Sequence, residues 1–121
     1  SEVYIISDGG ENGLHETTKK LLENQNLRVA SNTKGITYSQ HLTQLARAKM
    51  VVLCYSNDNE HWLRVKGNDI LKSKGISSAR PLDRIVLVKT NEHLDTSDYE
   101  EIFTDIVTST NQLTSILKHQ S

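Results

Sequence analysis

The sequence has little net charge, one cysteine and no long apolar segment. Its formal charge of −1 argues against a nucleic-acid-binding surface built on bulk positive charge. The lone Cys54 excludes an intramolecular disulfide and fits a reducing, cytoplasmic compartment. No apolar run approaches the roughly 20 residues that a membrane helix requires, and no signal-peptide pattern opens the chain. We therefore expect neither nucleic acid nor a membrane among its partners.

The length fits one domain. A chain of 121 residues can bury roughly two-thirds of its unfolded surface without help from a disulfide or a metal. No internal repeat, low-complexity tract or linker divides it. Ser1 is not a natural initiator and the first apolar segment begins at Val3, so we expect residues 1–121 to be a single domain taken from a longer polypeptide.

Five apolar segments alternate with helical patterns. The predicted strands are residues 3–6, 27–29, 50–55, 84–88 and 102–107, the last weakened by Thr104 and Asp105. Because helices separate successive strands, we expect parallel strands and right-handed crossovers. Five such strands favour a three-layer, flavodoxin-like α/β fold with strand order 2-1-3-4-5 and helices on both faces of the sheet.

Several local signals fix the helices. Ser39 is expected to cap the second helix, and Asn57-x-x-Glu60 resembles a capping box for a third that stops at Gly75. The closing helix should begin behind Ser109 or Thr110. The histidines at positions 15, 41, 61, 93 and 119 show no ligand spacing, so we expect surface residues and no metal site. Cys54, within an apolar segment, is expected to be a buried hydrophobe rather than a nucleophile.

In such a sheet, ligands bind where the first and third strands end, here at residues 7–11 and 55–60. The glycine-rich segment 8–13 has a position from which backbone amides can cradle a phosphate. It lacks the P-loop and dinucleotide spacings, and Asp8 and Glu11 would repel an anion, so a capped turn is the favoured account. It also lacks the hydroxyl-rich loop of flavodoxins and the acidic cluster of receiver domains.

Residues 56–67 are the most informative stretch. Trp62, the only tryptophan, falls in the first turn of the third helix, where its commonest role is to anchor that helix on the sheet. Lys66, one turn further on the same face, is either directed toward the end of the third strand or simply a solvated charge. Gly67 costs helix propensity, which predicts close packing against its backbone.

Three segments resemble Toll/interleukin receptor (TIR) domains of the prokaryotic kind, and more narrowly the TIR-like modules attached to bacterial STAND-type NTPases. They are residues 3–8, residues 48–55, and residues 60–66 with their continuation to Pro81. The Trp-Leu-Arg-x-Lys stretch is the most specific part, and the likeness spans residues 3–117. The resemblance implies a self-association loop that includes Asn32, Lys34 and Gly35. It also implies a ligand pocket formed by Ser7, Asp8, Tyr55, Ser56, Trp62 and Lys66.

The resemblance implies two activities. Many TIR domains assemble as signalling scaffolds, and others cleave NAD with a glutamate four residues beyond a tryptophan. That position is Lys66 here, and the resemblance implies that it is also basic in the narrower group. The positive charge of Lys66 would oppose the positive charge that develops during cleavage. The candidate catalytic residues are therefore Lys66 itself and two nearby acids, Glu60 and Asp69.

We accordingly expect a signalling or protein-interaction module of a prokaryotic defence or regulatory protein, whose partners are other domains of that protein and copies of itself. Two alternatives stay open. One is an NAD-cleaving enzyme with an altered site that uses Asp69 or another acid. The other is a nucleotide-binding sensor without turnover, in which Lys66 and Arg64 hold phosphates. NAD is the ligand or substrate in these alternatives, and no further cofactor is expected.

Overall fold

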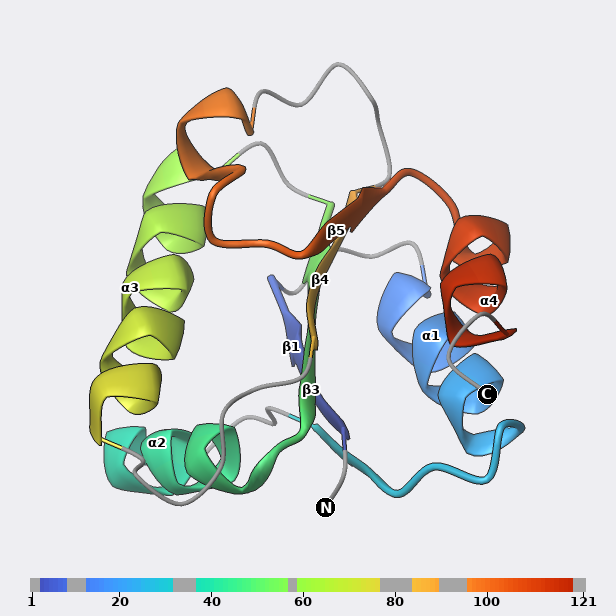
Figure 1. Ribbon diagram of the computed structural model, residues 1–121, viewed down its shortest axis with the longest axis horizontal. Helices are drawn as coiled ribbons and strands as arrows, with labels where there is room; N and C mark the ends of the chain where they lie inside the picture. Colours follow the sequence, from blue (N-terminus) through green and yellow to red (C-terminus); the bar gives the residue numbers. More distant parts are fainter. Residues whose placement is uncertain are drawn as a thin grey trace.

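A five-stranded parallel sheet runs through the centre of the protein (Figure 1). The structure, a computed structural model, describes residues 3–8, 13–31, 37–56, 59–76, 84–89 and 96–118. The strand order is β2-β1-β3-β4-β5, which confirms the predicted flavodoxin-like α/β fold. The strands are β1 (Val3–Ser7), β2 (Val29–Ser31), β3 (Met50–Tyr55), β4 (Arg84–Lys89) and β5 (Asp105–Val107).

Helices cover both faces of this sheet, as predicted. Figure 1 shows α2 (Tyr38–Arg47) and α3 (Glu60–Ile76) on one side, and α1 (Leu14–Glu23) and α4 (Thr110–Lys118) on the other. A short 3-10 helix, η1 (Ser97–Tyr99), lies beside the beginning of α3. No helix in the described part of the chain is both long and apolar enough to cross a bilayer.

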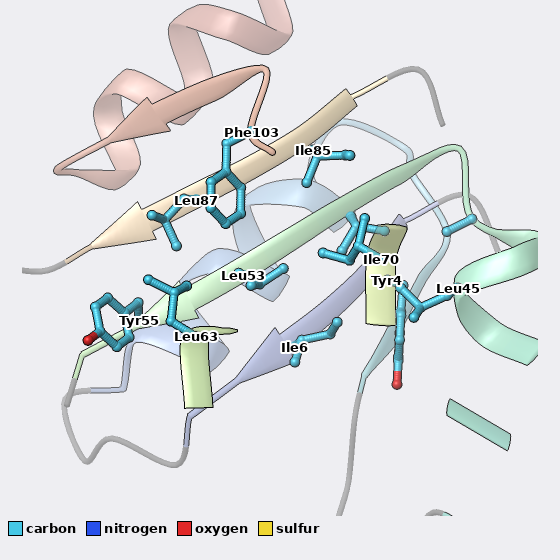
Figure 2. Close-up of a cluster of buried hydrophobic side chains, with 12 residues drawn as sticks. Tyr4, Ile6, Leu45, Leu53, Tyr55, Leu63, Ile70, Ile85, Leu87 and Phe103 are labelled. Carbon is cyan, nitrogen blue, oxygen red and sulfur yellow. The ribbon is translucent and has the colours of Figure 1, made fainter. Parts of the chain in front are cut away.

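Each face of the sheet has its own apolar core, because successive side chains of a strand point to opposite faces. The core under α2 and α3 contains Tyr4, Leu53 and Leu87, and Figure 2 shows these side chains with their neighbours. The core under α1 and α4 contains the alternate residues of the same strands, among them Ile5 and Val52. All six residues of β3 are buried, which explains the continuous apolar run seen in the sequence.

The helix caps differ in part from the predictions. Thr37, and not Ser39, caps α2: its hydroxyl accepts from the Gln40 N–H at 3.1 Å, and the Gln40 amide oxygen accepts from the Thr37 N–H at 2.9 Å. Thr37 is favoured over Ser39 because Gln40, three residues after Thr37, completes a capping box with it. At α4 the hydroxyl of Ser109 accepts from the Gln112 N–H at 3.3 Å, so Ser109 is the cap of the two candidates.

The cap of α3 also differs. The Oδ1 atom of Asn59 accepts from the Trp62 N–H at 3.1 Å, so the capping contact comes from Asn59, while Asn57 lies outside the described residues. Glu60 accepts instead from the Tyr99 hydroxyl at 3.3 Å. The helix continues through Gly75 to Ile76 rather than stopping at the glycine.

Two strand boundaries were predicted wrongly. β2 begins at Val29 instead of residue 27, because the chain leaves α1 through a turn in which Asn26 has a φ of 64°. β5 begins at Asp105, because Phe103 turns into the core beneath α2 and α3. Thr104 still links to β4 through its hydroxyl, which bonds both the N–H and the carbonyl of Ile85 at 3.0 Å.

Candidate functional site

Asp8 ties together the carboxyl ends of β1 and β3, the edge at which the sequence predicts a ligand. Its Oδ2 accepts from the Ser56 N–H at 2.7 Å, and its Oδ1 accepts from the Ser56 hydroxyl at 2.8 Å. The Asp8 N–H in turn donates to the Cys54 carbonyl at 3.2 Å. A carboxylate therefore lies at this edge of the sheet, where its charge is unfavourable for a phosphate. Residues 9–12 lie outside the described part of the chain.

Trp62 anchors the beginning of α3 on the same edge, as predicted. Its ring is stacked on that of Tyr55, with the ring centres 6.1 Å apart and the planes 3° from parallel. Tyr55 is buried and Trp62 is half-buried, so part of the Trp62 side chain reaches solvent. Ser7 pairs with Cys54 in the sheet. The structure thus brings Ser7, Asp8, Tyr55, Ser56 and Trp62 together at this edge.

The remaining pocket residue, Lys66, is half-buried one turn further along α3. The pKa of His41 in α2 is lowered mainly by burial, and the positive charge of Lys66 lowers it further. Arg64 is exposed. The proposed self-association loop, with Asn32, Lys34 and Gly35, lies outside the described residues.

A largely buried polar network joins α2, α3 and β1 (the α2–α3 network: Tyr4, Tyr38, His41 and Asp69). The Nε2 atom of His41 lies 3.1 Å from Asp69 Oδ2, and the Tyr38 hydroxyl donates to Asp69 Oδ1 at 3.1 Å. On the other side of the ring, His41 Nδ1 lies 2.7 Å from the Tyr4 hydroxyl. His41 is 3% exposed and Asp69 is 4% exposed. The expectation that all histidines are surface residues is therefore wrong for His41.

The hydrogen bonds of the network and the lowered pKa of His41 together favour one neutral tautomer of the ring. A carboxylate only accepts, so Nε2 bears a hydrogen toward Asp69, and in the neutral ring Nδ1 accepts from the Tyr4 hydroxyl. Burial lowers the pKa of His41 and the charge of Lys66 lowers it further, while Asp69 acts in the opposite direction. The contact between His41 and Asp69 is thus a hydrogen bond of a neutral ring rather than an ion pair.

A hydroxyl, an imidazole and a carboxylate in series resemble an acid–base relay, but Tyr4 is unsuited to chemistry. Its side chain is completely buried, and burial, reinforced by the charge of Asp69, raises the pKa of Tyr4 to about 12. The hydroxyl is therefore kept protonated and away from any substrate. Tyr38, 55% exposed, is the member of the network that reaches solvent. The arrangement acts as a structural link between three elements.

One sequence signal for His41 was available. His41 precedes Leu45 by four residues and so shares the buried face of α2 with it.

Cys54 is buried, as the sequence predicts. Burial raises the pKa of its thiol to about 12, and its sulfur lies 3.8 Å from the Thr18 hydroxyl. Within the described ranges, no group of three or more His, Cys, Asp or Glu side chains is arranged to hold a metal ion.

Comparison of the chain with protein-family models, with curated proteins and with solved structures finds no significant match in any of the three.

Proposed function

We propose that this chain is a TIR-like signalling and protein-interaction module that works in the cytoplasm of a prokaryote. It contacts other domains of a larger defence or regulatory protein, and copies of itself. The observation that supports this choice over an enzyme is the position of Asp69. The resemblance to NAD-cleaving TIR domains requires a carboxylate near Lys66, and the Asp69 carboxylate is buried and already accepts from His41 and Tyr38.

The distribution of exposed apolar side chains also supports an interaction module. Among the described residues, the exposed large hydrophobic side chains are Tyr38, Val65 and Leu71. All three belong to α2 and α3, the helices on one side of the sheet in Figure 1. Protein interfaces use such side chains on rigid elements as their central contacts, and tyrosine is enriched among them.

Self-association and binding to adjoining domains test the proposal. We expect the mass measured by sedimentation velocity to rise with concentration, or the domain to bind the rest of its parent protein. Val65→Lys and Leu71→Lys should weaken that association, because they place charge within the contact. Thr17→Lys is the matched control, an exposed position of α1 on the opposite face of the sheet. A domain that stays monomeric and binds no part of its parent protein would contradict the proposal.

The stacked pair of Tyr55 and Trp62 favours a second candidate, a nucleotide site at the carboxyl edge of the sheet. A planar base or a nicotinamide ring could stack on the half-buried indole. Nicotinamide release from NAD tests whether such a site turns over. The domain should be crowded on a surface, because the resemblance implies that TIR enzymes act when assembled.

Two substitutions separate the outcomes of that assay. Turnover that survives Lys66→Ala but not Asp69→Asn would identify an enzyme with a relocated carboxylate, provided that circular dichroism shows an intact fold. Nucleotide binding without turnover that is lost in Lys66→Glu would identify a sensor. With neither turnover nor binding under crowding, the interaction module stands.

A further inference from the structure

The α2–α3 network contains matched numbers of donors and acceptors. Its three hydrogen bonds run from the Tyr4 hydroxyl to His41 Nδ1, from His41 Nε2 to Asp69 Oδ2, and from the Tyr38 hydroxyl to Asp69 Oδ1. Each bond uses one hydrogen and one acceptor atom, so the set is complete with a neutral imidazole.

One additional proton on His41 breaks this match. Nδ1 would become a donor that faces the Tyr4 hydroxyl, and Tyr4 would have to turn its own hydrogen elsewhere. Tyr4 is completely buried, and within the described residues His41 is its hydrogen-bond partner. Protonation therefore leaves a buried donor without an acceptor, which costs its full desolvation energy.

The charges around His41 come from α3. Lys66 opposes a positive imidazole and Asp69 favours one. The groups that face the ring from β1 and from α2 itself are the phenols of Tyr4 and Tyr38, and the pKa of each is raised, so both stay neutral. Burial and Lys66 together outweigh the attraction of Asp69, and the neutral ring is the favoured form in the folded protein.

The packing of α2 against the rest of the domain depends strongly on His41, because few of its side chains are buried. Of its ten residues, the two that are buried are His41 and Leu45. Much of its remaining surface is polar and exposed, including Ser39, Gln40 and Thr43. A helix anchored by Leu45, the half-buried Leu42 and one buried histidine should open locally at a lower free energy than the sheet.

We propose that the α2–α3 network is a proton-operated latch: protonation of His41 releases α2 from β1 and α3 while the β1-β3-β4 sheet stays paired. Acidification would then uncover the flank of α3 that carries Lys66 and Asp69. The inference rests on the packing of α2 and holds whether or not the domain is an interaction module.

Hydrogen exchange of the intact chain between pH 8 and pH 5 tests the latch, with rates corrected for the intrinsic pH dependence of amide exchange. We expect protection factors across α2 to fall by up to about tenfold per pH unit on the acid side, the slope for uptake of one proton. Amides of β1, β3 and β4 should keep their protection. In His41→Gln, α2 should show no such pH dependence, whereas His61→Gln, which alters an exposed histidine of α3, should retain it.

If His41→Gln does not fold, ring resonances of the wild-type chain provide the test. The midpoint of α2 opening must then coincide with the titration of the His41 ring measured by NMR. Constant protection of α2, loss of protection in α2 and the sheet together, or a midpoint that follows another histidine would each overturn the proposal.

Discussion

Nε2 of His41 lies 3.1 Å from Oδ2 of Asp69, and both side chains are buried where α2 packs against α3. The carboxylate that a relocated active site would need is therefore occupied by a structural contact. Each member of this pair also bonds a tyrosine hydroxyl: His41 bonds the buried Tyr4, and Asp69 bonds the exposed Tyr38.

The two tyrosines of the network should differ in their contribution to stability. Tyr4→Phe removes the donor to a buried imidazole nitrogen, so it should lower the free energy of unfolding by about 1–3 kcal/mol. Tyr38→Phe should cost less, because the Tyr38 side chain is exposed and the Asp69 carboxylate keeps its contact with His41. Urea denaturation at neutral pH measures both values. A larger loss for Tyr38→Phe would contradict this account of the network.

Stability should fall on the acid side of neutrality because of His41. Its pKa is lowered in the folded state, so below its ordinary value of 6.5 the unfolded chain binds more protons than the folded one. The contribution is complete above pH 6.5 and is lost as the pH falls toward the folded pKa. The difference in unfolding free energy between wild type and His41→Gln should shrink from pH 8 to pH 5. A constant difference would mean that His41 does not titrate differently in the two states.

The thiol of Cys54 should be inert in the folded protein. Burial raises its pKa from 9.0 to about 12, which lowers the thiolate fraction by roughly a thousandfold. Alkylation with iodoacetamide at pH 8 should therefore be very slow without denaturant and fast in denaturing urea, as followed by mass spectrometry. Labelling of the native protein at the rate of a free thiol would show that Cys54 is accessible.

Gly67 and Ile102 should be coupled. A Cβ atom at position 67 would lie 2.9 Å from Ile102 Cδ1, so Gly67→Ala sets a gain of about 1 kcal/mol in helix propensity against displacement of that methyl group. Ile102→Val removes the methyl group. In a double-mutant cycle, Gly67→Ala should be more favourable in the valine background by about 0.5 kcal/mol or more. Additive effects would mean that Ile102 moves away freely.

The contacts of Asp8 should hold the carboxyl edge of the sheet. Asp8→Ala removes a charged acceptor of two hydrogen bonds from Ser56 and should destabilise the fold by about 1.5–3 kcal/mol. Ser56→Ala loses one of the two bonds and should cost less. Asp98→Ala, at an exposed position of η1, is the control and should stay within about 0.5 kcal/mol of wild type in thermal or urea unfolding.

The sheet could be predicted from the sequence because its strands are buried on both faces. β1, β3 and β4 have apolar residues at nearly every position, which no surface helix needs. The edge strands were placed less well, since each has three residues and its neighbours decide where pairing starts. At β5, the hydroxyl of Thr104 makes contacts with β4 that no apolar pattern announces.

The candidate site could be predicted only in part. The edge residues Asp8, Tyr55 and Trp62 follow from the ends of parallel strands and from the lone tryptophan. The network around His41 could not be derived, because Tyr4 and Asp69 lie 37 and 28 residues from His41 along the chain. Polar side chains also do not register in an apolar pattern. The position of His41 on the Leu45 face of α2 was the one available indication.

The two edge strands of the sheet, β2 and β5, have a consequence for assembly. β2 and β5 are three residues long, and in β5 the side chain of Asp105 is tied to Arg84 at 2.8 Å. Edge strands as short as these expose few unpaired backbone groups, so a strand from another molecule can form few hydrogen bonds with the edge of the sheet. Copies of this domain, or strands of other proteins, should therefore not join it by continuous backbone pairing into fibres. Any stable assembly has to be made by side chains of the helices and connecting segments, and it should stay sensitive to single substitutions there.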